Sequence, residues 1–344
     1  MPQYRPRADG TGRTRRAVLG GGVALMSAPA AFAAWSPAQV LPDPAIHVLD
    51  ESFSKYRLTT ASIERLATGF RWSEGPVWFG DQRCVIWSDV PNNRLMRWSE
   101  ETGLVDEFRK PSNYGNGNAR DLQGRLVTCE ELTRRVTRTE YDGSITVLAD
   151  RYDGKRLNSP NDVAVKNDGS VWFTDPTAGI ISNYEGKIAT EELPTGLYRV
   201  DSNSGAISLM TNEMNWPNGL AFSPDYQTLY VIESRATPRT IWAYGLTSSG
   251  TQLGERRLVY KCQFDETPDG MRVDSTGMLW VGWGMGKPGL DGVRVMTPDG
   301  HAIAHISLPE RCANLCFGGL YKNRLFMAAS HSLYSLYLNV SGLP

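Results

Sequence analysis

Polar residues recur at the starts of apolar strand patterns along this chain, and most of them carry oxygen donors. Six related segments begin at positions that we call anchors: Glu74, Asn116, Asn161, Asn218, Asp269 and Phe317. Neighbouring anchors lie between 42 and 57 residues apart. Carboxylate and amide oxygens are the ligands that a hard cation such as calcium prefers. Asn and Asp before a strand are also common turn formers, but five polar anchors in six segments favour a shared cation site.

The segments that follow the anchors predict short paired strands. After Asn161, apolar residues alternate with polar ones, the turn Asn167-Asp168-Gly169 interrupts them, and a second apolar run follows. This pattern is typical of a strand, a hairpin turn and a second strand. Repetition at a period of roughly 40 to 50 residues, with several short strands per unit, is typical of propeller blades rather than of helical repeats. We therefore predict an all-β fold, a six-bladed β-propeller in which the anchors converge near the central channel.

The predicted propeller closes between the two ends of the chain. Residues 63–67 alternate as a strand does, and they are expected to join the C-terminal strands at residues 325–328 and 333–338 in the last blade. The resulting domain boundaries are an export signal at 1–33, a surface arm at 34–60 and a catalytic propeller at 61–344.

The N-terminus carries a targeting pattern. Arg15 and Arg16 precede a short apolar run, and Ala31-Phe32-Ala33 offers a small-residue cleavage site. Twin arginines before a weakly apolar segment are typical of a twin-arginine export signal, although an arginine pair can also arise by chance. We expect a periplasmic or secreted protein.

Composition excludes several kinds of partner. The 344 residues carry a formal net charge of −1, and the basic residues are scattered, so nothing indicates nucleic-acid binding. After the signal, no apolar stretch approaches membrane-spanning length, which argues against a membrane partner. The five cysteines are an odd number without paired spacing, so a disulfide framework is not expected, while a bridge between Cys312 and Cys316 stays open. The oligomeric state is not predicted.

Several phrases resemble one known family. SEGPVW from Ser73, SPND from Ser159, PNGLAFS from Pro217 and PDGMRVDSTGMLWVG from Pro268 resemble the senescence marker protein, gluconolactonase and luciferin-regenerating enzyme family of six-bladed propellers. The FTDP phrase from Phe173 looks most like the bacterial gluconolactonase branch. The resemblance implies a lactonase whose divalent metal is held by Glu74, Asn161, Asn218 and Asp269. Calcium is the metal expected first, with magnesium, manganese or zinc as alternatives.

Three further residues are candidates for substrate binding. The resemblance places Asn116 on the pocket wall rather than among the metal ligands. Ser159 stands where the vertebrate branch commonly has an arginine, so that branch's mode of substrate binding is not expected here. His331 follows the last inner strand and is a third candidate for the pocket lining. The loop at residues 175–187 is long enough to serve as a lid, and the glycine-rich segment 283–287 is a candidate for the pocket wall.

The predicted ligands suggest a mechanism for opening a lactone, the small-molecule substrate that the resemblance implies. A bound dication would polarise the substrate carbonyl, and Asp269 would be the general base for the attacking water. Two alternatives stay open: a phosphotriesterase-type hydrolase on the same metal site, and a propeller without enzymatic activity that binds sugars or serves as a scaffold. Metal content and proton release on a panel of lactones would separate them.

Overall fold

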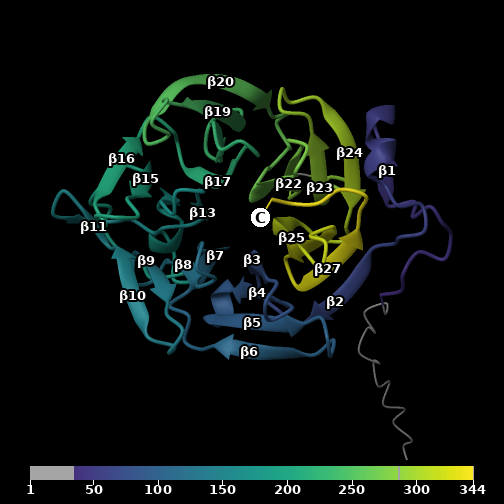
Figure 1. The fold of residues 1–344 in the computed structure, drawn as a ribbon, viewed down its shortest axis with the longest axis horizontal. Helices are drawn as coiled ribbons and strands as arrows, with labels where there is room; N and C mark the ends of the chain where they lie inside the picture. The colour runs from purple at the N-terminus through teal and green to yellow at the C-terminus, as the bar shows by residue number, and fades with distance from the viewer. Residues whose placement is uncertain (1–34, 286, 344) are drawn as a thin grey trace, which may run out of the picture. The chain divides into compact units, whose positions relative to one another are not determined.

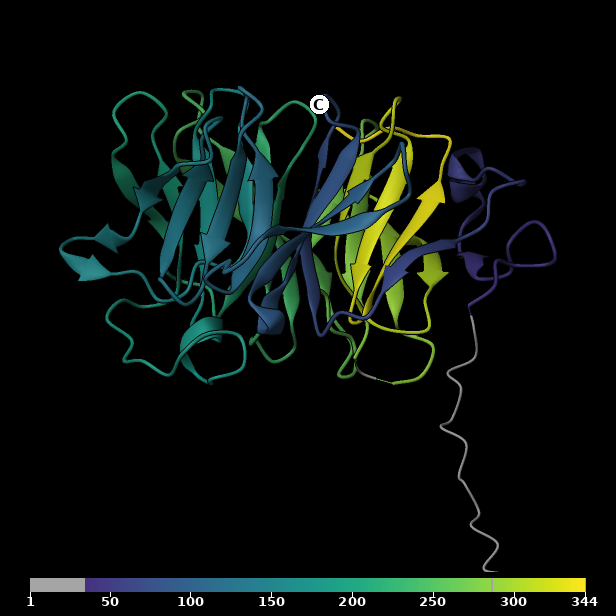
Figure 2. The same cartoon turned by 90° about the horizontal axis from the view of Figure 1, so that it is seen from below.

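The computed structural model describes residues 35–343 with the exception of residue 286, and Ser36 begins its compact unit. Six antiparallel sheets surround a central axis in that unit (Figure 1), and Figure 2 shows their strands from the side. The predicted six-bladed propeller is confirmed. The twin-arginine segment lies outside the described residues.

Blades 1 to 3 each consist of four antiparallel strands, given from the axis outward. Blade 1 contains β3 (Ser73–Phe79), β4 (Cys84–Asp89), β5 (Arg94–Ser99) and β6 (Val105–Arg109). Blade 2 contains β7 (Gly115–Arg120), β8 (Leu126–Glu130), β9 (Arg135–Thr139) and β10 (Ile145–Ala149). Blade 3 contains β13 (Val163–Val165), β14 (Val171–Asp175), β15 (Gly196–Val200) and β16 (Ile207–Thr211). A small hairpin between blades 2 and 3 consists of β11 (Arg151–Tyr152) and β12 (Lys155–Arg156).

Blades 4 to 6 continue the ring. Blade 4 contains β17 (Pro217–Phe222), β18 (Thr228–Glu233), β19 (Thr240–Leu246) and β20 (Leu253–Lys261). Blade 5 contains β21 (Met271–Val273), β22 (Leu279–Trp283), β23 (Gly292–Met296) and β24 (Ala302–Ser307). Blade 6 contains β25 (Cys312–Gly318), β26 (Arg324–Ala329) and β27 (Ser332–Tyr337). Three short 3₁₀ helices are described: η1 (Glu51–Tyr56), η2 (Val90–Asn92) and η3 (Ala178–Ile180).

The N-terminal chain supplies the outer strands of two blades. β2 (Glu64–Thr68) pairs with β27 and completes blade 6, as predicted for the closing strand. β1 (Ile46–Val48) pairs with β24 and adds a fifth strand to blade 5 (Figure 1). The predicted surface arm at 34–60 therefore contains a strand and a 3₁₀ helix. Both added strands cover an exposed sheet edge, which would otherwise present unpaired backbone groups.

The hairpins within the blades follow from their turn residues. The Asp121 carboxylate accepts hydrogen bonds from the backbone N–H groups of Gln123 and Arg125, at 3.0 and 2.8 Å. Gly124 then turns the chain with φ +87°, a conformation that glycine adopts without a Cβ clash. Asp168 caps the turn before β14 in the same way, since its carboxylate accepts from Ser170 N at 2.9 Å. These local bonds explain why the Asp and Gly residues predicted the turns.

The core lies between the blades and is rich in aromatic side chains. Trp87, Trp172, Trp280 and Trp283 are fully buried. The five cysteines are buried and free, so Cys312 and Cys316 do not form a bridge. Both lie on the single strand β25, where residues four apart are separated by about 13 Å at 3.3 Å per residue. In the described residues, no helix has the length and apolar character required to cross a membrane.

Candidate active site at one mouth of the channel

Four of the inner strands, β3, β7, β17 and β25, begin with a bulge near the anchors. Pairing of β3 with β4 is in register at Glu74 and resumes only at Val77, and β7 and β17 show the same shift at their starts. The bulges press neighbouring inner strands together: Gly117 N donates to Asn161 O at 2.7 Å, and Gly270 N donates to Ala313 O at 2.7 Å. A Cβ on Gly75 would lie 2.2 Å from Asn116 O. Only glycine permits this approach.

The sixth anchor was assigned to the wrong residue. In blade 6 the bulge lies between Cys312 and Asn314, so Ala313 occupies the position of Glu74 and Asp269. Phe317 lies further along β25, opposite Leu325. The position remains apolar, as predicted, and the ring of oxygen donors is open at blade 6.

Asp269 is the most highly connected of the predicted ligands. Its Oδ1 accepts a hydrogen bond from Asn218 Nδ2 at 2.8 Å, and its Oδ2 forms an ion pair of 2.6 Å with Arg311 Nη2. The two side chains of the pair are 9% and 8% exposed. Burial raises the pKa of the Asp269 carboxyl above its ordinary value, whereas Arg311 and Asn218 act in the opposite direction. The structure thus brings together two predicted ligands from blades 4 and 5.

Glu74 lies near Asp269 and is buried as well. Burial raises the pKa of the Glu74 carboxyl well above its ordinary value, and the neighbouring carboxylates of Asp269 and Asp162 raise it further. Its Oε2 accepts a hydrogen bond from Gly75 N at 2.9 Å. Each of these buried carboxylates makes ionisation of the other less favourable. A cation bound between them would offset that repulsion.

Asn161 and Asn116 meet at a carboxylate that sequence analysis missed. Glu131 Oε1 accepts hydrogen bonds from Asn116 Nδ2 at 3.0 Å and from Asn161 Nδ2 at 3.3 Å. Glu131 Oε2 is buried and has no hydrogen-bond partner among the described residues. Burial and the nearby Glu185 raise the pKa of Glu131 well above its ordinary value. The one feature of the sequence that could have indicated Glu131 is its position just after β8, in the phrase VTCEE.

Ser159 lies beside the loop that contains η3. Its side chain is fully buried, its Oγ donates to Pro176 O at 2.7 Å and accepts from Gly179 N at 3.0 Å. Its backbone N–H donates to Asp175 Oδ1 at 2.8 Å. The structure does not bring the Ser159 hydroxyl into the site, because it both donates and accepts a hydrogen bond with this loop. Substrate binding by Ser159 stays a prediction.

That loop is the segment predicted to be a lid, and it lies beside the site. Trp216, next to the blade 4 inner strand, donates from Nε1 to Thr177 Oγ1 at 2.7 Å. Burial and the Asp269 carboxylate raise the pKa of Glu185, while Arg311 lowers it, so this loop residue lies within electrostatic reach of the site.

His331 and Met285 lie at the periphery. The His331 side chain is 67% exposed, and its Nδ1 lies 3.1 Å from Glu310 Oε2. Among the described residues, it has no hydrogen bond to any predicted ligand, so the structure does not bring it into the site. Met285, from the predicted wall segment, lies with its Sδ 3.0 Å from Arg311 Nη1. That contact connects the segment to Asp269 through Arg311.

The donor set fits a hard dication. The described residues contain no group of three or more His, Cys, Asp or Glu side chains arranged for a metal. The predicted set has only two carboxylates, and its other two members are amides. The side-chain oxygens of Asn161 and Asn218 accept no hydrogen bond from the described residues and are therefore free to bind. Two buried carboxylates and two free amide oxygens are the ligand chemistry of calcium rather than of a softer metal.

Fold and site together define a six-bladed propeller with a buried carboxylate-amide site at one end of its channel. Residues 72–331 match the model of the SMP-30/Gluconolactonase/LRE-like region. The chain belongs to this family. It is 33% identical over 293 residues to a gluconolactonase from Zymomonas mobilis, covering 79% of this chain and 80% of the relative.

Two solved structures extend the comparison. A gluconolactonase from Xanthomonas campestris superposes with a TM-score of 0.79 at 38% identity, covering 88% of this chain and 96% of the other. A calcium-binding regucalcin from Agrobacterium tumefaciens has a TM-score of 0.66 at 18% identity, covering 81% and 94%. At that identity the regucalcin shares the fold.

Proposed function

We propose that this chain is a divalent-metal-dependent hydrolase that opens sugar lactones. Its gluconolactonase relatives support hydrolysis of a small lactone. The observation that carries the metal dependence is the pair of buried, mutually repelling carboxylates, Glu74 and Asp269, in a mouth that also holds two free amide oxygens.

Four residues would hold the ion: Glu74, Asn161, Asn218 and Asp269. When bound, the dication supplies Lewis-acid polarisation of a carbonyl oxygen. The neutral amides keep the ligand charge at −2, which leaves the ion electrophilic. Calcium is the metal we propose first, because all four donors are oxygens.

Asp269 is the residue we propose as the general base. Burial raises its pKa and so its basicity, while the ion pair with Arg311 holds Oδ2 in place and favours the charged carboxylate. Asp269 would remove a proton from water as the water oxygen bonds to the lactone carbonyl carbon. The bond between that carbon and the ring oxygen then breaks, and the ring oxygen takes up a proton.

Glu131 is suited to supply that second proton. Burial raises its pKa and so favours the protonated carboxyl, and its Oε2 has no hydrogen-bond partner among the described residues. Asn116 and Asn161 orient the carboxyl through Oε1. The sum of these steps is one lactone and one water converted into one hydroxy acid, which ionises and releases a proton to the solvent.

The test is metal content measured together with proton release. Purified protein is analysed for bound metal, and pH-indicator assays follow hydrolysis of a five-membered and a six-membered sugar lactone, with a phosphotriester as comparison. We expect bound or restorable dication and lactone hydrolysis that chelator abolishes. Hydrolysis of the phosphotriester alone would favour the alternative hydrolase, and a protein inactive with every added dication would favour a binding or scaffold role.

A further inference from the structure

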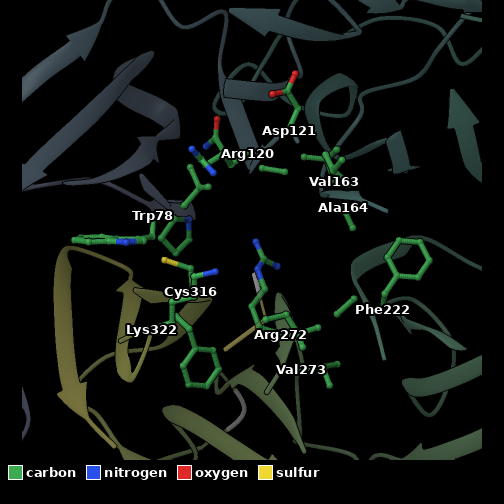
Figure 3. A pocket seen from close by; sticks show the side chains of 18 of the residues that line it. Trp78, Arg120, Asp121, Val163, Ala164, Phe222, Arg272, Val273, Cys316 and Lys322 are labelled. Atoms are coloured by element: carbon green, nitrogen blue, oxygen red, sulfur yellow. The ribbon is translucent and has the colours of Figure 1, made fainter. Parts of the chain in front are cut away.

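A second cavity lies at the end of the channel opposite to the anchors. The inner strands begin at the anchor mouth, and this cavity is lined by their later residues, such as Trp78, Arg120, Phe222 and Val273 (Figure 3). Its volume is about 650 Å³, within the usual range for small-molecule sites. It shares none of its lining residues with the predicted ligands or with Asn116, Glu131 and Arg311.

Most of its lining residues are apolar. Inner strands of several blades contribute aliphatic or aromatic side chains: Val77, Val163, Ala164, Leu220, Phe222 and Val273. Leu343, near the C-terminal end, is a further lining residue, and the backbone around it is held by a hydrogen bond of 2.8 Å from Gly342 N to Lys322 O. Such walls suit a hydrocarbon body better than a polyhydroxy sugar.

Three cations project into this apolar cavity. Arg272 lies between the buried residues Met271 and Val273 on β21. Side chains alternate along a strand, so that of Arg272 points the other way, into the channel. Figure 3 shows Arg272 among the labelled lining residues. Its Nη1 donates to the backbone oxygen of Met271 at 2.7 Å and lies 3.7 Å from Asp162 Oδ2, longer than a charge-assisted hydrogen bond. Its Nε and Nη2 make no hydrogen bond to the described residues. Among the described residues, the acidic partner of Arg120 is the exposed carboxylate of Asp81, at 3.4 Å.

Lys322 is the third cation and has no acidic partner among the described residues. Burial lowers the pKa of its ammonium group, and the positive charge of Arg120 lowers it further. The remaining lining carboxylate, Asp121, is already paired with Arg125 at 2.7 Å. Positive charge therefore exceeds what the neighbouring acids neutralise, and an anion would relieve the repulsion between Arg120 and Lys322.

We propose that this cavity binds a small carboxylate with an aliphatic or aromatic body. The carboxylate would be held by Arg272 and Lys322, since a guanidinium matches a carboxylate in planar geometry. The body would lie against Ala119, Ala164 and Ala221, which line the same cavity. The site is separate from the hydrolytic mouth, so its existence does not depend on the proposed function.

The test is calorimetric titration of the full chain in chelator with octanoate. Octanamide has the same body without the charge, and gluconate has a carboxylate without the apolar body. We expect octanoate to bind at least 10-fold more tightly than either. We also expect Arg272→Gln and Lys322→Gln each to weaken octanoate binding at least 10-fold, whereas Lys287→Gln, outside this cavity, leaves it unchanged.

Asp269→Asn tests whether octanoate binds at the hydrolytic site instead of in this cavity. Octanoate binding should be unchanged in that variant. Arg272→Gln also removes the cation that lies beside Asp162. Lys322→Gln avoids this side effect, because Lys322 has no acidic partner among the described residues. Equal binding of octanoate and octanamide, tighter binding of gluconate, or unchanged binding in Lys322→Gln would each overturn the proposal. So would the loss of octanoate binding in Asp269→Asn.

Discussion

At the scale of single residues, the site is a set of buried carboxyl groups in different hydrogen-bonding environments. Asp269 forms an ion pair with Arg311, and neighbouring carboxylates raise the pKa of Glu74. Glu131 Oε2 has no hydrogen-bond partner among the described residues. Divergent environments are how similar groups acquire different proton affinities. We therefore assign them different roles: ligand and base, ligand, and proton donor.

Substitution of either proposed acidic ligand should abolish activity while leaving the fold intact. Outer-shell residues of metal sites cost about 10 to 100-fold when changed, so loss of a ligand in Glu74→Ala or Asp269→Asn should lower kcat/KM by at least roughly 100-fold. Lactone hydrolysis is measured with metal in excess, and circular dichroism checks the fold. Asp106→Asn, in an exposed ion pair on blade 1, is the matched control. Near wild-type turnover in both ligand variants would exclude this site.

Asp175 should make stability depend on pH. Burial raises the pKa of this fully buried carboxyl from 3.8 to about 7, although it accepts hydrogen bonds from Asn158 N and Ser159 N. Between those values the folded protein keeps a proton that the unfolded chain has lost. The free energy of unfolding therefore falls as pH rises through this window, by up to about 1.4 kcal/mol per pH unit for one such group.

Urea denaturation of chelator-treated protein between pH 4 and pH 7 measures that slope. Asp175→Asn should make it shallower, because the titrating group is gone. Asp142→Asn is the control, since hydrogen bonds from Ser144 lower the pKa of this exposed group and place its titration below the window. An identical slope in wild type and Asp175→Asn would show that Asp175 does not carry a raised pKa.

At the scale of elements, we propose that the loop with η3 is a lid, and its position depends on the buried hydroxyl of Ser159. Ser159 bonds both Pro176 and Gly179, and Trp216 bonds Thr177 at its start. The loop in turn carries Glu185 toward the site. Its order should therefore matter for substrate binding even though Ser159 itself is covered.

Ser159→Ala should destabilise the protein and weaken substrate binding through the loop. The change leaves a buried N–H and a buried carbonyl without partners, which costs about 1 to 3 kcal/mol. We expect a lower melting temperature and a higher KM with little change in kcat. Ser204→Ala, in an exposed turn, should change none of these quantities. A higher KM at unchanged stability would instead indicate direct contact of Ser159 with substrate.

At the scale of the whole molecule, closure of the ring assembles the proposed ion site. Its four donors come from blades 1, 3, 4 and 5, and β2 completes blade 6 from the other end of the chain. The unfolded chain has no comparable arrangement of these donors. Metal binding and folding are therefore expected to be linked.

Folding stability should rise with metal concentration. A ligand that binds only the folded state adds about 2.7 kcal/mol at a hundred times its dissociation constant. Thermal unfolding is followed in chelator and across a calcium titration, together with lactone hydrolysis. Chelator should lower the melting temperature and stop hydrolysis, and calcium should restore both. Verified metal-free protein that melts unchanged and still opens lactones would contradict the metal-dependent mechanism.

We also propose that the chain is exported through the twin-arginine route. Arg15→Lys combined with Arg16→Lys should leave the precursor in the cytoplasm, because that signal is recognised through its arginine pair. Cell fractionation and immunoblotting locate the product, and Arg13→Lys, just before the pair, is the control. Normal periplasmic protein in the double variant would rule out this route.

The sequence by itself determined the repeat, the closing strand and five of the six anchors. These features depend on alternation, turn residues and spacing, which are local properties of a chain. The anchors were recognisable because each precedes the same kind of strand, and the propeller follows from repeating that unit.

Only the tertiary structure decided which side chains meet. The bulge in β25 puts Ala313 rather than Phe317 in the sixth position, and spacing alone does not show a bulge. Glu131, Arg311 and Arg272 are not anchors, and their roles depend on partners in other parts of the chain. Ser159 appeared to be an accessible polar residue, but the fold buries its hydroxyl against the loop. Such contacts depend on packing between segments that are distant in the sequence, and local sequence patterns do not indicate that packing.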